Sequence, residues 1–295
     1  MNNFKFGLIG VGGYVAPRHL KAIKENGSTL DICFDPNDSV GIIDSYYPKA
    51  DYFNEYERFE REISKRSNDE KSKLDYLSIC SPNYLHDTHI RLGLSNKINV
   101  ICEKPLVLLP SNLDLLAEFE TKSGCSIKTI MQLRYHPELI MLKEKLTNSS
   151  GAHKVNLKYV TPRGKWYHYS WKGVESKSGG LVTNIGIHLF DLLIWLFGNV
   201  LKYTIEFRSS ERLIGKLVME KAEVEWFLSI DSEDLPKESN QKSLRELIID
   251  EERIEFSDGF TNLHTKVYEG ILSGKGLGIN DARPSLELVY NIRKQ

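Results

Sequence analysis

The stretch Phe4–Leu20, FKFGLIGVGGYVAPRHL, decides the fold of this chain. Its first part is an apolar run typical of a buried strand, and Gly10, Gly12 and Gly13 follow it directly. Pro17 then stands where a helix can begin, because proline is well tolerated in a first helical turn. A strand, a glycine turn and a helix in this order predict the first unit of a sheet whose strands alternate with helices.

The same alternation continues to about residue 131. Further strands are expected at 29–34, 74–80, 99–102 and 126–131, with helices at 17–26, 55–65, 84–96 and 111–122. Helices between short buried strands are typical of crossovers in a parallel sheet. We therefore expect a doubly wound, mostly parallel Rossmann sheet.

From about residue 155 the pattern changes to alternating apolar and polar residues. Such strands, which bury one face, are expected at 202–208, 213–220, 222–231, 245–250 and 253–256. They predict a largely antiparallel sheet with an open face. An apolar helix over 185–197, ended by Gly198, precedes the sheet, and helices near 263–272 and 281–293 close the chain.

These patterns predict an α/β protein with two domains. Residues 1–131 are expected to form the Rossmann domain, and residues 132–295 an α+β domain for substrate binding and oligomerisation. Lys and Arg number 39 against 40 Asp and Glu, so the formal net charge is only -1. This balance gives no overall electrostatic reason for binding nucleic acid or an anionic membrane, and we expect neither partner.

The cysteines indicate a reducing compartment. Cys33, Cys80, Cys102 and Cys125 form no C-x-x-C pair, and three of them lie in apolar runs. We therefore expect reduced cysteines in the core of a cytoplasmic protein. The apolar stretch 4–15 does not oppose this, because it is rich in glycine and resembles a strand and turn more than a signal peptide. His86 and His89 are three residues apart on an expected helix, but no third ligand accompanies them, so we expect no metal.

The glycine turn after the first strand suits a dinucleotide. It comprises Gly10, Gly12, Gly13, Tyr14 and Val15. The glycines allow a tight turn and let a pyrophosphate approach main-chain amides at a helix N-terminus, although Val15 replaces the usual third small residue. Asp35 ends the second strand and can bind ribose hydroxyls while repelling a 2′-phosphate, which favours NAD; an aspartate that caps its own turn is the alternative.

Two further motifs follow neighbouring strands, Ser81-Pro82-Asn83-x-x-His86 and Glu103-Lys104-Pro105. Open α/β sheets bind ligands at the carboxyl ends of such strands, so Ser81, Asn83, His86, Glu103 and Lys104 are expected to contact the cofactor. Pro105 restricts Lys104 to extended conformations, so Lys104 is expected to point where the strand end points. A lysine before proline in an ordinary surface loop is the alternative.

His188 is the most informative histidine. Asn184, at a helix-cap position, precedes it by four residues and Asp191 follows by three, so the three are expected on one face of a short helix. A helix N-terminus disfavours the imidazolium, which leaves a neutral ring able to accept a proton near pH 7. A structural histidine is the alternative.

The segment 161–180, TPRGKWYHYSWKGVESKSGG, concentrates cations and aromatic rings. Four Lys or Arg residues stand against a single Glu175, with Trp166, Tyr167, Tyr169 and Trp171 between them. This composition suits an anionic ligand with a planar ring, such as a nucleotide-linked acid. An oligomer contact or a single-stranded nucleic acid site has similar composition, but the neutral chain disfavours the latter.

Together, Gly10-x-Gly12, Ser81-Pro82-Asn83-x-x-His86, Glu103-Lys104-Pro105 and Gly186-x-His188-x-x-Asp191 resemble the glucose-fructose oxidoreductase/inositol dehydrogenase (Gfo/Idh/MocA) family. The resemblance covers essentially the whole chain. The stretches GYVAPRHLKAI, DPNDSVGIIDSYYP, QLRYHP and RGKWYHYSWKG are similar to a bacterial subgroup, the UDP-N-acetyl-2-amino-2-deoxyglucuronate dehydrogenases of the WlbA/WbpB type.

The resemblance implies that NAD+ takes a hydride from C3 of UDP-N-acetyl-D-glucosaminuronic acid, giving a 3-keto sugar for lipopolysaccharide O-antigen synthesis. It implies a catalytic pair, Lys104 and His188, with Asn184 where many relatives have aspartate; which of the pair is the base stays open. Substrate contacts are expected from Arg134, Arg163, Trp166, Tyr167, Lys172, Asn184 and His188.

The subgroup further implies 2-oxoglutarate as a hydride acceptor and a homotetramer packed through the open sheet face. Two other functions stay open. One is a related dehydrogenase acting on another sugar or inositol, which has no need of the cationic aromatic segment. The other is a non-catalytic NAD-binding regulator, against which the presence of both Lys104 and His188 argues.

Overall fold

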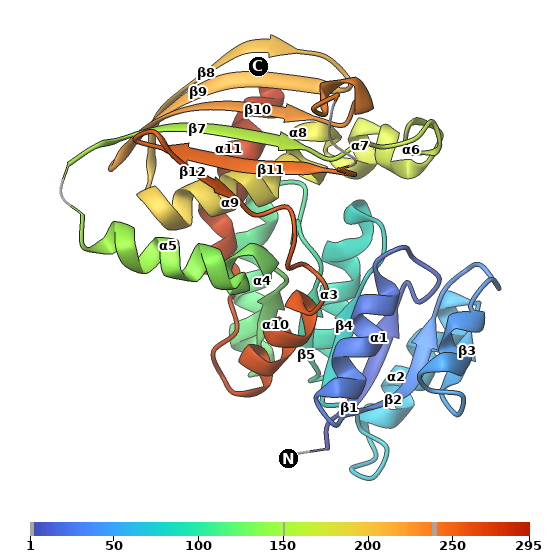
Figure 1. The fold of residues 1–295 in the computed structure, drawn as a ribbon. Helices are drawn as coiled ribbons and strands as arrows, with labels where there is room; N and C mark the ends of the chain where they lie inside the picture. Colours follow the sequence, from blue (N-terminus) through green and yellow to red (C-terminus); the bar gives the residue numbers. More distant parts are fainter. Residues whose placement is uncertain (1–2, 150, 238–240) are drawn as a thin grey trace. The chain divides into compact units, whose positions relative to one another are not determined.

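The computed structural model of the chain describes residues 3–149, 151–237 and 241–295. Their contacts group into two compact units (Figure 1). One comprises Met1–Ile130 with Asn262–Arg283, and the other comprises Met131–Thr261 with Pro284–Gln295. The first unit thus includes a segment from late in the chain that a division into residues 1–131 and 132–295 leaves out.

The first unit contains a six-stranded parallel sheet in the order β3-β2-β1-β4-β5-β6. Its strands are β1 (Lys5–Ile9), β2 (Thr29–Phe34), β3 (Asp51–Phe53), β4 (Tyr76–Ile79), β5 (Asn99–Cys102) and β6 (Ile127–Thr129). The expected Rossmann sheet is confirmed, and the strand order reverses at β1 and β4, where such sheets bind ligands. β3, which we did not expect, has three residues and no apolar run of its own.

Crossover helices connect these strands as expected. They are α1 (Ala16–Glu25), α2 (Tyr56–Ser67), α3 (His86–Ser95) and α4 (Ser111–Ser123), with short 3-10 turns η1 (Gly41–Ser45) and η2 (Asn83–Leu85). The late segment adds α10 (Leu263–Leu272), which packs against α1. Leu263, Val267 and Ile271 are buried at a spacing of four, so one face of α10 faces the unit's interior.

The second unit contains a mixed six-stranded sheet in the order β12-β11-β7-β10-β9-β8. Its strands are β7 (His153–Val160), β8 (Val200–Arg208), β9 (Arg212–Met219), β10 (Ala222–Ser229), β11 (Leu244–Ile249) and β12 (Glu252–Glu255). The expected largely antiparallel sheet is confirmed, with one exception. β7, which we did not predict as a strand, pairs in parallel with β10 near the centre of the sheet.

Helices of the second unit cover one face of this sheet (Figure 1). They include α5 (Pro137–Thr147) and α9 (Gly186–Phe197), and the Phe190 ring of α9 meets Trp226 of β10 edge-on at 5.1 Å. The remaining elements are η3 (Gln132–Tyr135), α6 (Trp166–Tyr169), η4 (Trp171–Gly173), α7 (Glu175–Ser178), α8 (Gly180–Asn184), η5 (Ser232–Asp234) and α11 (Ile279–Lys294).

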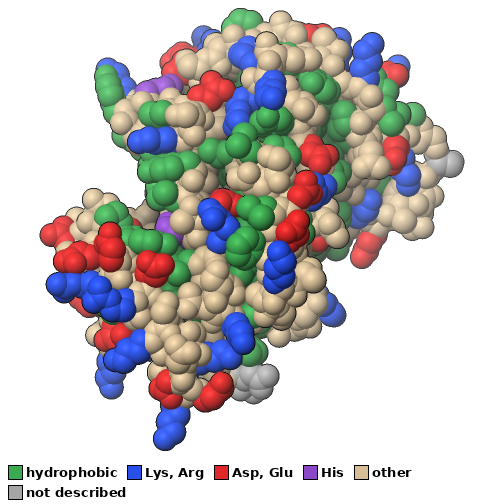
Figure 2. All heavy atoms as spheres, turned by 180° about the vertical axis from the view of Figure 1, so that it is seen from behind, with side chains coloured by type: hydrophobic (Ala, Val, Ile, Leu, Met, Phe, Trp, Pro, Cys, Tyr) green, Lys and Arg blue, Asp and Glu red, His purple; other side chains and the backbone are tan. Residues whose placement is uncertain are grey.

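Among the described residues, no individual helix has the length and apolarity needed to cross a membrane, although one bent pair, Glu175–Asn184 with Gly186–Phe197, satisfies these criteria jointly. On the face shown in Figure 2, acidic and basic side chains are intermingled. This distribution agrees with the near-neutral charge of the chain.

Candidate active site

The glycine turn leaves the first amides of α1 open to an anion. Gly10 has φ +87°, and a Cβ there would lie 2.7 Å from the Cys80 carbonyl carbon, so only glycine fits. The Gly13 N–H donates to the Gly10 oxygen at 3.0 Å, and α1 begins three residues later. Within the described chain, no side chain caps α1, so its amides suit a pyrophosphate.

Asp35 is fixed beside this turn. Its Oδ2 accepts the Gly12 N–H at 2.9 Å, and its Oδ1 accepts the Asn37 N–H at 3.0 Å. The second contact is the turn cap that we considered as the alternative, so Asp35 does serve its own turn. A carboxylate has about four acceptor sites, which leaves capacity for ribose hydroxyls as well.

His86 is fully buried and serves the main chain. Its Nδ1 lies 2.7 Å from the Pro105 oxygen and its Nε2 lies 2.8 Å from the Ser81 oxygen. His86 thus connects the turn after β4 with the turn after β5. Because its ring nitrogens contact these carbonyl groups and none of its surface is exposed, we no longer expect it to touch a cofactor.

His89, the other histidine of the considered metal pair, contacts Ser81 Oγ through Nδ1 at 2.9 Å. Burial lowers the pKa of His89 to about 4, with a further contribution from neighbouring His86. The ring is therefore neutral near pH 7, and its Nδ1 shares a hydrogen bond with the Ser81 hydroxyl.

Glu103 lies in a buried cluster that the sequence analysis missed. Its Oε1 is 3.0 Å from His19 Nε2 and 3.0 Å from His264 Nε2. The three side chains could also be regarded as a metal site, because their ligand atoms lie within 4.8 Å of one another. Ligand atoms about 2.0–2.1 Å from a tetrahedral zinc ion lie roughly 3.3 Å apart, so the shorter contacts here are those of N–H···O hydrogen bonds.

In the second unit, Asn184 is the last residue of α8 and His188 is in the first turn of α9. The expected helix cap is wrong: Ile185 occupies the N-cap position, and the chain bends by 43° between the two helical segments. Asn184 and His188 are therefore not on one face of one helix. Asn184 Nδ2 instead donates to Tyr167 Oη at 2.9 Å, and both side chains are buried.

Asp191, also of α9, forms a two-point ion pair with Arg134. Arg134 Nε donates to Asp191 Oδ2 at 3.0 Å, and Nη2 donates to Oδ1 at 2.6 Å. Arg134 belongs to η3, so the pair fixes that turn to α9. A guanidinium held in this way has a defined direction, as a substrate-binding residue requires.

The segment 161–180 contains a series of short helical turns. The sequence analysis described only the composition of this segment and did not predict its secondary structure. Lys172 Nζ lies 4.1 Å from the centre of the Trp171 ring and 5.9 Å from that of Trp166. Burial lowers the pKa of Lys172, and nearby Arg163 lowers it further. Arg163 Nη1 donates to Thr161 Oγ1 at 2.9 Å. The segment thus holds Lys172 against two aromatic rings, with Arg163 nearby.

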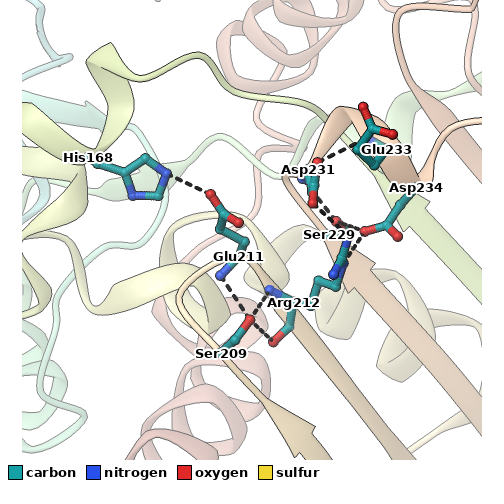
Figure 3. A network of polar contacts seen from close by, with 8 residues as sticks. All are labelled: His168, Ser209, Glu211, Arg212, Ser229, Asp231, Glu233 and Asp234. Carbon is teal, nitrogen blue, oxygen red and sulfur yellow. Dashed lines mark hydrogen bonds and ion pairs between the residues drawn. The ribbon is translucent and has the colours of Figure 1, made fainter.

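Polar contacts fix this segment to the end of the sheet (Figure 3). His168 of α6 pairs with Glu211, just before β9, at 3.2 Å. The next residue, Arg212, pairs with Asp231 and with Asp234, each at 2.6 Å. The turn that carries Trp166 and Tyr167 therefore contacts the start of β9 through the exposed side chains of His168 and Glu211.

Each unit thus brings together part of the expected set. The first unit brings together the glycine turn, Asp35 and the turns carrying Ser81 and Lys104. The second pairs Asn184 with Tyr167 and, separately, Arg134 with Asp191. Sequence analysis missed His19 and His264. The sequence held only part of the information needed to find them. A buried carboxylate in the Glu103-Lys104-Pro105 motif requires hydrogen-bond donors, but the motif does not show where in the sequence those donors lie.

Comparison with known proteins adds to this geometry. Residues 4–130 match the model of an oxidoreductase family with an NAD-binding Rossmann fold (GFO_IDH_MocA), and residues 151–234 match the model of its C-terminal alpha/beta domain. D-glucoside 3-dehydrogenase of Escherichia coli is 28% identical over 43% of this chain and 36% of its own length. The first curated relatives are matched over only 19% to 36% of their lengths.

Solved structures match over both units. The WlbA (WbpB) dehydrogenase from Thermus thermophilus, in complex with NAD and UDP-GlcNAcA, has 46% sequence identity and a TM-score of 0.95, covering 98% of this chain and 94% of that chain. The same dehydrogenase was also solved with NAD and alpha-ketoglutarate. WlbA from Bordetella pertussis shares the fold at 18% identity and a TM-score of 0.81, covering 100% of this chain and 95% of that chain.

Proposed function

Since the chain belongs to the GFO_IDH_MocA oxidoreductase family, we propose that it oxidises the C3 hydroxyl of UDP-N-acetyl-D-glucosaminuronic acid with NAD, giving the 3-keto sugar for surface-polysaccharide synthesis. One observation carries the substrate: the chain is 46% identical, over both units, to a dehydrogenase solved with NAD and UDP-GlcNAcA. The cationic aromatic segment supports it, because a nucleotide sugar acid carries both negative charge and a planar base.

The glycine turn and Asp35 fit NAD. The amides that begin α1 would receive the pyrophosphate, and Asp35 would receive the adenosine ribose. A carboxylate already fixed by Gly12 and Asn37 cannot swing away to admit a 2′-phosphate, which supports NAD over NADP. When bound, NAD+ supplies the hydride acceptor.

Lys104 and His188 are the proposed catalytic pair. One would take the proton of the C3 hydroxyl, while the other would orient that oxygen and stabilise the alkoxide as it develops. Asn184 cannot relay a proton as a carboxylate would, since an amide does not titrate in this range. Its hydrogen bond to Tyr167 supports an orienting role instead.

Arg163 and Lys172 are the proposed binding residues for the carboxylate and phosphate groups of the substrate, and Arg134 is a further proposed substrate contact. Lys172 presents its charge against Trp171, and Trp166 is half-exposed, so its ring is available for packing against a base or sugar. Tyr167 lies under the same segment and fixes Asn184. These roles remain parts of the proposal.

A cytoplasmic location and a homotetramer are further proposals. The free thiols of Cys33, Cys80 and Cys102 are buried, which fits a reducing compartment. Leu201, Phe207 and Val218 of β8 and β9 are exposed, which supports subunit packing through this face of the second sheet. Light scattering would measure the mass in solution.

The test is to incubate the protein with NAD+ and the UDP-sugar acid and to seek the 3-keto sugar by mass spectrometry. Because NADH that stays bound would stop the reaction after one turnover, a second reaction includes 2-oxoglutarate and is examined for 2-hydroxyglutarate. The 3-keto product is expected in at least one reaction. Its absence from both contradicts the assignment, and turnover of free sugars or inositol would favour the related dehydrogenase.

A further inference from the structure

A buried polar cluster stands directly behind Lys104. Glu103 Oε2 accepts the main-chain N–H of Lys104 at 3.2 Å, while its Oε1 faces His19 and His264. Both histidines and Glu103 are less than a tenth exposed. One carboxylate therefore joins α1, α10 and the turn after β5.

The directions of these hydrogen bonds follow from chemistry. Ionised Glu103 only accepts, so His19 Nε2 must donate to it. In a neutral imidazole the other nitrogen then accepts, and its partner at 2.7 Å is the hydroxyl of Tyr268. The Tyr268 oxygen in turn lies 2.7 Å from the Ser78 hydroxyl, which must be the donor. A single directed chain therefore runs from β4 to Glu103.

The charge states of Glu103 and His19 support the same hydrogen-bond directions. Burial raises the pKa of Glu103, but the hydrogen bonds from His19 and His264 outweigh it and hold that pKa well below its ordinary value. Burial lowers the pKa of His19. The cluster therefore contains an ionised carboxylate and a neutral His19 near pH 7, and the carboxylate depends on its donors.

The residue after Lys104 is also held. The Pro105 carbonyl oxygen lies 2.7 Å from His86 Nδ1, on the helix that follows β4. The main-chain N–H of Lys104 thus donates to buried Glu103, and the carbonyl group of the next residue lies against buried His86. This is more restraint than a surface turn needs.

We propose that His264 and His19 are positioning residues for Lys104. By donating to Glu103 they hold the carboxylate that fixes the lysine main chain, and so they set where its ammonium group stands. The inference rests on the proposed function, which makes Lys104 a catalytic residue. It also gives the late segment Asn262–Arg283 a role in the reaction, since α10 supplies His264 and Tyr268.

The test compares two variants of His264 with a neighbour on the same helix. His264→Gln keeps an N–H donor at similar reach, whereas His264→Leu removes it. Thr265→Val is the control, because Thr265 Oγ1 donates to Glu25 on α1 at 2.7 Å rather than to Glu103. We expect His264→Leu to lower kcat at least about tenfold with KM for NAD+ within about threefold, and the other two variants to stay within about threefold of wild type.

If His264→Leu does not fold, Glu103→Gln replaces it. The glutamine oxygen can face the two imidazoles, which places its NH2 group against the Lys104 N–H, donor to donor. The same loss of kcat is then expected in a folded protein that still binds NAD. Equal kcat values for His264→Leu and His264→Gln, or an unchanged kcat in Glu103→Gln, would overturn the inference.

A substrate-free measurement separates this inference from the proposed function. If wild type does not turn over the UDP-sugar acid, the proposed function fails by itself. The positioning of Lys104 is then read from the rate at which acetic anhydride acylates it across pH, followed by mass spectrometry. We expect the rate in His264→Leu to differ at least about threefold from wild type and from His264→Gln; coincident rates overturn the inference.

Discussion

The side-chain amide of Asn184 donates a hydrogen bond to the hydroxyl of Tyr167 across 2.9 Å, at a point where both residues are buried. This contact fixes the end of α8, immediately before the bend that leads to His188. In this contact the Nδ2 end of the amide faces the hydroxyl, which gives the side chain a defined direction. Asn184 is therefore an oriented group on the substrate side of the proposed reaction.

Replacing Tyr167 with Phe should leave the Asn184 amide with a buried donor that has lost its partner. We expect a loss of about 1–3 kcal/mol in the free energy of unfolding, measured with urea. Tyr169→Phe is the control, since Tyr169 is 89% exposed. A variant as stable as the control would mean that the contact is not maintained in solution.

The ion pair between Arg134 and Asp191 should be the more costly contact to break. Asp191 is 2% exposed, so Asp191→Asn leaves a largely buried guanidinium without its counter-charge and should destabilise the protein by about 3–5 kcal/mol. Denaturant titration measures the loss. The double variant Arg134→Met with Asp191→Leu should recover much of it, because it removes both charges; a double variant as unstable as the single one would contradict this explanation.

The sequence predicted the parallel sheet well because each strand and crossover helix carries its own local pattern. It did not predict β7, although Val155, Leu157 and Tyr159 are buried at a spacing of two. The Asn184 cap failed for a related reason: Thr183, Asn184 and Gly186 are all acceptable near the start of a helix, so the local sequence does not place the break at Ile185. Where several neighbouring residues could begin a helix, packing rather than local preference sets the boundary.

The cluster around Glu103 could not be found from sequence. Its partner His264 lies 161 residues away, on a helix whose pattern says only that one face is buried. The sequence assigned that helix to the second domain, whereas its contacts belong to the first unit. Such pairs are set by tertiary contacts that a single sequence does not encode locally.

The lowered pKa of His89 predicts that the folded protein loses stability in acid. The pKa of this histidine is lowered from 6.5 to about 4, chiefly by burial, so the unfolded chain binds this proton more readily between those values. Stability should therefore be complete above about pH 6.5 and fall toward about pH 4, by about 3 kcal/mol from this group.

His89→Asn tests that assignment, since an asparagine amide can hydrogen-bond to the Ser81 hydroxyl as donor or acceptor but does not titrate. Urea unfolding between about pH 7 and pH 4 should show a decline smaller by about 3 kcal/mol than in wild type. Parallel stability curves for the two proteins would contradict it. The loss of stability that remains in the variant comes from the protonation of other groups. These include buried His19 and His86, whose pKa values are also lowered by burial.

Gly10→Ala should lower the free energy of unfolding by more than backbone strain alone would. Gly10 and Gly124 both have positive φ, +87° and +70°, so alanine strains the main chain at either position. A Cβ at Gly10 would also meet the Cys80 carbonyl carbon at 2.7 Å, whereas at Gly124 it meets no described atom within 4 Å. We expect about 1–2 kcal/mol from Gly124→Ala and a larger loss, with weakened NAD binding, from Gly10→Ala. Equal losses in thermal unfolding and unchanged NAD titration would remove the steric argument.

Charge reversal at Lys172 should separate a nucleotide-sugar acid from a neutral sugar as the substrate. Lys172→Glu places a carboxylate between Trp171 and Trp166, where the proposed substrate brings its own negative charge. We expect KM for the UDP-sugar acid to rise at least about tenfold with little change in KM for NAD+. Lys165→Glu is the matched control, because it makes the same change of charge on an exposed side chain of the same segment and should shift KM by less than about threefold. If both variants keep the wild-type KM, the cationic aromatic segment does not bind the substrate, and a contact between subunits becomes the favoured role for it.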